Sequence, residues 1–226
     1  MIMIILVGPQ GAGKTTLANI IKKRLSKDHK VCVVKLIDYT ILHHTYLKLL
    51  RILAKNPSNE IIFARLAPIY VFLHLVGYVI SRIKFVTYSL TKKCHVIVED
   101  EGYVFKELAD FYFIMGITGA LRNRFTKYGA RSFLRFLFRA AFKKMYHYII
   151  IYVDAPYEIL LQRYIITKRY IEPEAYINFQ RFLYKILLQY VVAYRKDFCQ
   201  CIHIRSMDVK SLLSIADFII NVLRMV

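Results

Sequence analysis

A short glycine-rich segment near the amino terminus constrains the fold of this 226-residue chain more than any other feature. The segment GPQGAGKTT, residues 8–16, directly follows the apolar run MIMIILV and matches the pattern G-x-x-x-x-G-K-[ST]. Glycines let a backbone curl closely around an anion, so that successive N–H groups and the start of the next helix point at its oxygens. The sequence therefore predicts a strand, a phosphate-binding loop and a helix, in that order.

The residue types of this loop suit the binding of a nucleotide. Lys14 would reach the β- and γ-phosphates, and the hydroxyl of Thr15 would bind Mg²⁺. The predicted nucleotide site comprises Gly8, Gly11, Ala12, Gly13, Lys14, Thr15 and Thr16. A glycine-rich turn without a ligand is the alternative, but a chance match in a chain of this length is on the order of one per cent.

Short β-branched runs alternate with helical stretches along the rest of the chain, which is typical of a parallel sheet covered on both faces. We expect strands at residues 2–7, 31–37, 95–98, 148–154 and 199–204. Helices are expected at residues 15–26, 107–116, 121–146, 156–168 and 175–195 and after Asp208, with a mostly helical insert at 40–92. A chain of this length suits one domain. We therefore expect a single α/β domain over residues 1–226, a three-layer sandwich around a five-stranded parallel sheet.

Three consecutive acids follow the third expected strand, in the segment HVIVEDEG at residues 95–102. A carboxylate at the end of a neighbouring buried strand commonly holds Mg²⁺ or its waters beside a phosphate-binding loop. Asp100 is the first choice for this role, with Glu101 as a candidate base and Glu99 as the alternative register. A solvated acidic turn that caps the next helix is the competing interpretation. Acids are scarce in this basic chain, so their clustering here favours a functional site.

The chain contains 34 Lys and Arg against 15 Asp and Glu, which gives a formal net charge of +19. A surface of this charge attracts nucleotides, nucleic acid or acidic lipid headgroups, and charge alone does not choose among them. The expected helix at 121–146 carries cations at intervals of three or four residues: Arg124, Lys127, Arg131, Arg135, Arg139 and Lys143. The simplest interpretation of this basic helix is a solvated face opposite a core face. Three functional interpretations stay open: the helix binds an anionic acceptor, it contacts a nucleic-acid backbone, or it lies on acidic lipid.

Two features bear on the location of the protein. The amino-terminal run lacks the basic segment and the small-residue cleavage site of a signal peptide, so we expect a cytoplasmic protein. Residues 66–81 carry no formal charge, but this stretch is shorter than the roughly twenty apolar residues that span a bilayer. A buried helix is the favoured interpretation of this stretch, and a helix on a membrane surface is the alternative.

Four cysteines are too few and too scattered for a disulfide framework. We expect them to be reduced thiols in the core. Cys199, Cys201 and His203 alternate onto one face of a strand, but a tetrahedral structural zinc site needs a fourth ligand.

The segment IYVDAPYEILLQRYIITKR, residues 151–169, adds a further pattern, which is an apolar strand followed by D-x-P-x-E-x-x-L-x-R and a basic cluster. Together with the phosphate-binding loop and the strand-end acids, it resembles the thymidylate-kinase-like branch of the P-loop nucleotide kinases. The resemblance implies a P-loop NTPase fold with a short lid at residues 167–172. It also implies that Arg163, Lys168 and Arg169 neutralise charge on the transferring group.

The chain departs from this family on the acceptor side. Thymidylate kinases typically end the third strand with D-R-Y or D-R-F, where this chain has EDEG, and IDYT replaces their proline- and arginine-bearing segment after the second strand. Other P-loop kinases place an acid after the second strand against an acceptor hydroxyl, which makes Asp38 a candidate, with a simple strand-end turn as the alternative. Arg65 and Arg124 are further candidates for binding the acceptor.

These features predict an ATP- and Mg²⁺-dependent phosphotransferase that transfers the γ-phosphoryl group to a nucleoside monophosphate or a similar anionic acceptor. The predicted catalytic residues are Lys14, Asp100, Glu101, Arg163 and Arg169, with Thr15 and Asp100 at the metal. The alternatives are a nucleotide-dependent switch and a kinase of nucleic-acid ends or of a lipid-linked acceptor. The motifs N-K-x-D and L-S-G-G-Q do not occur, which disfavours a regulatory GTPase or a transport ATPase. Either a monomer or a homodimer is compatible with the sequence.

Overall fold

The computed structural model describes residues 1–34, 91–100, 146–167, 173–195, 199–206 and 208–225. It also describes residues 76, 77, 79, 80, 83, 85, 87, 88, 102, 104–106, 108, 109, 112, 116, 128, 132, 135, 136, 139 and 142.

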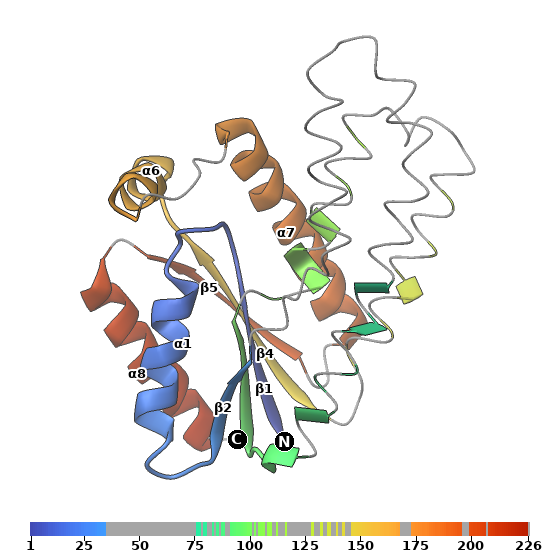
Figure 1. Cartoon of the computed structure of the whole chain (residues 1–226). Coiled ribbons are helices and arrows are strands. Elements are labelled where there is room, and N and C mark those ends of the chain that lie inside the picture. The colour runs from blue at the N-terminus through green and yellow to red at the C-terminus, as the bar shows by residue number, and fades with distance from the viewer. Residues whose placement is uncertain are drawn as a thin grey trace.

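Strands and helices alternate along the described part of the chain (Figure 1). The strands are β1 (Ile2–Val7), β2 (Val31–Val34), β3 (Val96–Asp100), β4 (His147–Asp154) and β5 (Cys199–Arg205). The helices with complete bounds are α1 (Lys14–Leu25), α6 (Tyr157–Ile166), α7 (Glu174–Arg195) and α8 (Val209–Met225). The predicted order of the described strands and helices is confirmed, and the bounds of β1, β3, β4 and β5 agree with the prediction to within two residues. Residues 35–37 of the second predicted strand, most of the predicted insert at 40–92 and most of the predicted helices at 107–116 and 121–146 lie outside the described residues.

The five strands form one sheet in the order β2-β3-β1-β4-β5, and every neighbouring pair is parallel. β1 lies at the centre, where five of its six residues are buried. A strand buried on both faces reads as a continuous apolar run, which explains the sequence of β1. Because β1 lies between β3 and β4, the loop that leaves its carboxyl end emerges beside the ends of both neighbours. This is the position at which open parallel sheets bind ligands.

Helices cover both faces of this sheet. Leu17 and Ile21 of α1 share one hydrophobic core with Ala216 and Ile219 of α8 and with Leu6 of β1. The opposite core contains Leu183 and Leu187 of α7, packed with Met3, Ile5 and Val7 of β1 and with Phe105 and Phe142. Figure 1 shows α1 and α8 side by side on one face and α7 on the other. The expected three-layer α/β sandwich is therefore confirmed.

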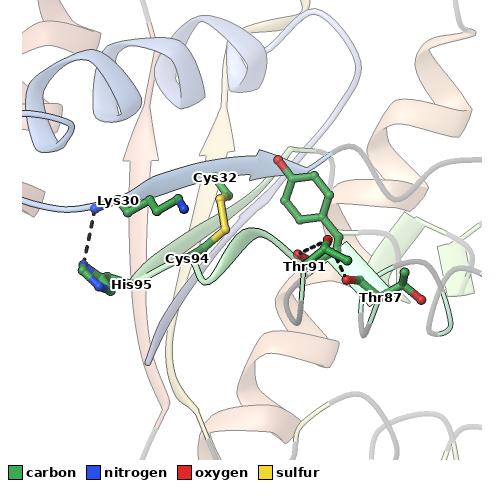
Figure 2. The surroundings of a disulfide bond; sticks show 7 residues. Lys30, Cys32, Thr87, Thr91, Cys94 and His95 are labelled. Carbon is green, nitrogen blue, oxygen red and sulfur yellow. Dashed lines mark hydrogen bonds between the residues drawn. A yellow bond between two sulfur atoms is a disulfide. The ribbon is translucent and has the colours of Figure 1, made fainter.

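The structure corrects the expectation that all cysteines are reduced. Cys32 in β2 and Cys94, two residues before β3, form a disulfide across a sequence separation of 62 residues (Figure 2). β2 and β3 are neighbours that pair from Val31 with Val96, so the starts of these strands bring the two thiols together. Cys199 is a buried free thiol, as predicted, and Cys201 is free but exposed. The disulfide covalently links the two ends of the stretch 32–94, which contains the predicted insert at 40–92.

Among the described residues, no helix is both long enough and apolar enough to cross a membrane. The uncharged stretch at 66–81 lies largely outside the described residues.

Candidate functional site

The glycine-rich loop connects β1 to α1 at the carboxyl edge of the sheet. Gly8, Gly11 and Gly13 have φ values of 146°, 77° and 99°, a region that other residues rarely adopt. A Cβ atom on Gly8 would lie 1.9 Å from the carbonyl oxygen of Val153 in β4. Gly13 is the N-cap of α1. The loop therefore requires glycine both for its backbone angles and for its close approach to β4.

Lys14 lies against the loop that precedes it. Its Nζ donates hydrogen bonds to the carbonyl oxygens of Gly8, at 2.8 Å, and Pro9, at 2.7 Å. The side chain is only 7% exposed, and a buried ammonium group is tolerated because such bonds replace its water. This arrangement keeps a desolvated positive charge at the start of α1, where the helix dipole also favours an anion.

Thr15 and Asp100 meet at the edge between β1 and β3. The Thr15 hydroxyl donates a hydrogen bond of 2.8 Å to Oδ2 of Asp100, and Asp100 pairs with Leu6 in the sheet. The other oxygen, Oδ1 of Asp100, is buried and has no hydrogen-bond partner within the described part of the chain. A buried carboxylate oxygen without a partner is energetically costly. Hydroxyl and carboxylate oxygens are the ligands that Mg²⁺ prefers, so this pair fits the predicted metal.

The direction of side chains along β3 selects Asp100 from the three acids. Successive side chains of a strand point to opposite faces. Val96 and Val98 belong to the core that contains α1, so Asp100, at the same parity, points toward the start of α1. Glu99 is also buried but points to the other face. The strand extends two residues further than predicted, so both acids belong to β3 itself.

Helix α6 contacts the outer side of the loop through two adjacent residues. Arg163 Nη1 donates to the carbonyl oxygen of Gly11 at 2.9 Å, and its Nη2 lies 3.4 Å from Ser206 Oγ. Burial lowers the pKa of the Arg163 guanidinium, and the negative charge of Asp208 acts in the opposite direction. The Tyr164 hydroxyl donates to the carbonyl oxygen of Gln10 at 2.7 Å.

Tyr164 is a site residue that the sequence analysis did not identify. An aromatic side chain on an apolar helix is normally interpreted as core, and Tyr164 is indeed fully buried. No local pattern in the sequence indicated its contact with the loop, because its partner Gln10 is 154 residues away.

The end of β4 is tied to α7 by an ion pair that the sequence analysis also missed. Asp154 Oδ1 accepts hydrogen bonds from the amide of Ala155, at 2.9 Å, and from Arg181 Nε, at 3.0 Å. Arg181 also donates to the side chain of Asn178 and to the carbonyl oxygen of Ala155. The amide of Ser206 donates to the carbonyl oxygen of Asp154 at 2.7 Å. Strands β4 and β5 and helix α7 are thus joined next to the loop.

Several predicted site residues lie outside the described residues: Asp38, Arg65, Glu101, Arg124, Lys168 and Arg169. Most of the predicted lid at 167–172 does so too, and only Arg135 and Arg139 of the cations on the basic helix are described. Both of these arginines are exposed. Throughout the described ranges, no group of three or more His, Cys, Asp or Glu side chains could hold a metal, which leaves zinc at Cys199, Cys201 and His203 without support.

Comparisons with known proteins find likeness in structure but not in sequence. No protein-family model and no curated protein sequence matches this chain. The deoxyadenosine kinase from M. mycoides with bound dCTP matches over 100% of both chains, with a TM-score of 0.57 and 15% sequence identity. The same kinase with the products dCMP and a flexible dCDP matches with a TM-score of 0.58 and 17% identity, again over 100% of both chains. A thymidylate kinase from Ehrlichia chaffeensis matches with a TM-score of 0.49 and 16% identity over 98% of both chains.

The two deoxyadenosine kinase structures show that the chain shares their fold. The P-loop kinase fold implied by the resemblance in the sequence is therefore confirmed, apart from the lid, most of which lies outside the described residues.

Proposed function

We propose that this protein is a Mg²⁺-dependent phosphotransferase that transfers the γ-phosphoryl group of ATP to a small nucleoside or nucleotide. The observation that carries the proposal is the unpartnered oxygen of Asp100, whose other oxygen accepts a hydrogen bond from Thr15, the residue that follows the buried Lys14. A structural turn has no need for a buried, half-satisfied carboxylate and a buried ammonium at the same strand-loop-helix junction. A site for a metal-bound triphosphate accounts for both.

The residues of the loop would each act on the triphosphate. The backbone N–H groups of residues 11–15 and the start of α1 would bind its oxygens. Lys14 would exchange the carbonyl oxygens of Gly8 and Pro9 for the β- and γ-phosphate oxygens. The Thr15 hydroxyl donates a hydrogen bond to Asp100 Oδ2, so the lone pairs of the hydroxyl oxygen, together with Asp100 Oδ1, would be available to hold Mg²⁺. Mg²⁺, when bound, neutralises charge on the phosphate oxygens.

Transfer would break the bond between the γ-phosphorus and the bridging oxygen, release ADP, and form a new bond from phosphorus to an acceptor oxygen. This chemistry depends on positioning and charge neutralisation more than on covalent catalysis. Arg163 and Arg169 are proposed to compensate charge during transfer, and either Asp38 or Glu101 to receive the single proton of the acceptor hydroxyl.

The acceptor could be a charged nucleoside monophosphate or a neutral nucleoside. The sequence indicated a nucleoside monophosphate. Two of the solved structures that share the fold are of a deoxyadenosine kinase, whose name describes a neutral nucleoside acceptor. A neutral acceptor requires fewer cations than a monophosphate does. It would also account for the departures of this chain from thymidylate kinases on the acceptor side.

The proposal is tested by incubating the protein with ATP labelled in the γ-phosphate and a panel of acceptors. The panel contains deoxynucleosides, nucleoside monophosphates and an oligonucleotide with a free 5′-hydroxyl. Label in a nucleoside monophosphate or diphosphate supports the proposal and identifies the acceptor class. Release of inorganic phosphate alone would favour the nucleotide-dependent switch, and label in the oligonucleotide would favour a kinase of nucleic-acid ends.

Replacing Asp100 with asparagine is expected to lower turnover about 100-fold at limiting Mg²⁺, because one charged ligand of the proposed metal is lost. Excess Mg²⁺ should restore part of this activity. The melting temperature should not fall, since the substitution removes a buried charge with an unsatisfied oxygen. Glu99→Gln is the matched control, because it changes the adjacent buried acid that points to the other face. If Asp100→Asn keeps the wild-type dependence on Mg²⁺, Asp100 is not a ligand of the metal.

We also propose three properties of the protein beyond the reaction itself. Contact with nucleic acid or with an acidic membrane surface through the basic helix at 121–146 is supported by the charge of that helix. A cytoplasmic location is supported by the amino-terminal sequence. The third property is a homodimeric state, which sedimentation analysis would test.

A further inference from the structure

Four consecutive carbonyl groups of the phosphate-binding loop all accept hydrogen bonds from side chains. Lys14 donates to the first two, those of Gly8 and Pro9. Helix α6 supplies donors to the next two. The Tyr164 hydroxyl lies 2.7 Å from the carbonyl oxygen of Gln10, and Arg163 Nη1 lies 2.9 Å from that of Gly11. These two donors come from 154 and 152 residues further along the chain.

The direction of these carbonyl groups decides whether the loop can bind an anion. A peptide unit places its N–H and its C=O on opposite sides, so an N–H that points at a phosphate requires a carbonyl that points away from it. A peptide that flips would present oxygen to the phosphate and repel it. A donor on the outer side opposes this flip, because the flip would leave both the donor and the carbonyl without a partner.

The ring of Tyr164 holds the same part of the loop by contact. A Cβ atom added to Gly11 would lie 3.0 Å from Cε1 of Tyr164, so the backbone at Gly11 packs directly on the ring. Tyr164 has no exposed surface, and its core neighbours restrict the movement of the ring. The hydroxyl is therefore presented to Gln10 from a fixed position, with little loss of side-chain entropy.

The two pairs of hydrogen bonds differ in what a nucleotide does to them. If a triphosphate binds as proposed, Lys14 turns toward phosphate oxygens and gives up hydrogen bonds to the carbonyl oxygens of Gly8 and Pro9. The bonds from α6 go to the carbonyl oxygens of Gln10 and Gly11, which point away from the N–H groups of the same peptides, so phosphate binding to those N–H groups would not break them. After such binding, the bonds from α6 would still hold the loop.

We propose that Tyr164 is a positioning residue that keeps the phosphate-binding loop in its nucleotide-binding conformation, and that this hold replaces the one Lys14 gives up when a triphosphate binds. The inference rests on the proposed function, because it assumes that Lys14 moves to a phosphate. Arg163 contributes to the same hold, but it is also proposed to compensate charge on the substrate. A substitution of Tyr164 tests the hold on the loop without changing charge near the substrate, because the Tyr164 hydroxyl is uncharged and donates to the backbone oxygen of Gln10.

Tyr164→Phe tests the inference because it removes the hydroxyl and keeps the ring that packs on Gly11. The Kd of a non-hydrolysable ATP analogue and the KM for ATP should both rise about 5- to 10-fold, the value of one hydrogen bond. The kcat at saturating ATP and the KM for the acceptor should stay within about twofold of the wild type. Amide hydrogen exchange in residues 8–13 of the nucleotide-bound protein should become faster.

Tyr148→Phe is the matched control, because Tyr148 is an equally buried tyrosine that belongs to the opposite core. This variant should bind the ATP analogue as the wild type does. An unchanged Kd and unchanged exchange in Tyr164→Phe, with a wild-type protein that binds the analogue, would overturn the inference and leave the proposed function standing. An equal loss of affinity in both variants, together with a lower melting temperature, would also overturn it. A wild-type protein that binds no nucleotide would refute the proposed function itself, and the inference with it.

Discussion

Alanine at position 14 is expected to lower turnover by about 100- to 1,000-fold and to leave the fold intact. The ammonium of Lys14 is buried, and a charge in a water-excluded site stabilises phosphate oxygens more strongly than a charge in water. The loss should therefore be largest in kcat, where charge on the transferring group develops. Because the same ammonium orders the carbonyl groups of Gly8 and Pro9, the affinity for ATP should fall as well.

Steady-state kinetics and thermal melting measure the two parts of this prediction. The melting temperature should change little, because alanine favours a helix and the variant no longer buries a charge. Lys22→Ala is the control, since Lys22 is an exposed lysine on the same helix α1 and lies in its last turn. Wild-type turnover in a clean preparation of Lys14→Ala would exclude the proposed mechanism.

The second large effect is expected on stability rather than on activity. Reduction of the disulfide between Cys32 and Cys94 should lower the free energy of unfolding by about 4 kcal/mol. The bond closes a loop with a sequence separation of 62 residues, and its removal gives the unfolded chain much more conformational freedom. In a domain of this size, the melting temperature should fall by about 8–16 °C.

A double variant with serine at Cys32 and Cys94 separates this bond from other effects of a reductant. Dithiothreitol should lower the melting temperature of the wild type to that of the double variant, and should leave the double variant unchanged. Cys201→Ser is the control, because Cys201 is a free and exposed thiol. Four alkylated thiols in the native protein without reductant, detected by mass spectrometry, would contradict the prediction. Since disulfides are rare in reducing compartments, the same alkylation in fresh cell extract also tests the expected cytoplasmic location.

Local features were readable from the sequence because one short segment contains everything they depend on. The phosphate-binding loop is an example. Its three glycines, Lys14 and Thr15 lie within nine consecutive residues, and positive φ angles at the glycines follow from the absence of a Cβ atom. The apolar runs of the strands likewise indicated a parallel sheet buried on both faces, because such runs leave no polar side for water. These features were sufficient to predict the fold.

The choice among the strand-end acids needed the sheet. The sequence placed three acids together, and the spacing alone favoured Asp100 only weakly. The parity of β3 against α1 turns Asp100 toward Thr15 and Glu99 away from it, and this parity depends on the pairing of β3 with β1. The disulfide likewise depends on the neighbouring positions of β2 and β3, which no pattern around Cys32 or Cys94 announces.

Contacts between distant segments were decided by the tertiary structure alone. Tyr164 looks like an ordinary core residue of α6 until the fold places its hydroxyl against Gln10, and Arg181 looks like one more surface cation until α7 brings it to Asp154. The physical reason is that hydrogen bonds and disulfides act over a few ångströms, whereas their partners here are 27 to 154 residues apart. The sequence determined the loop and the layers of this protein, and the packing of α6 and α7 against the sheet determined which side chains support them.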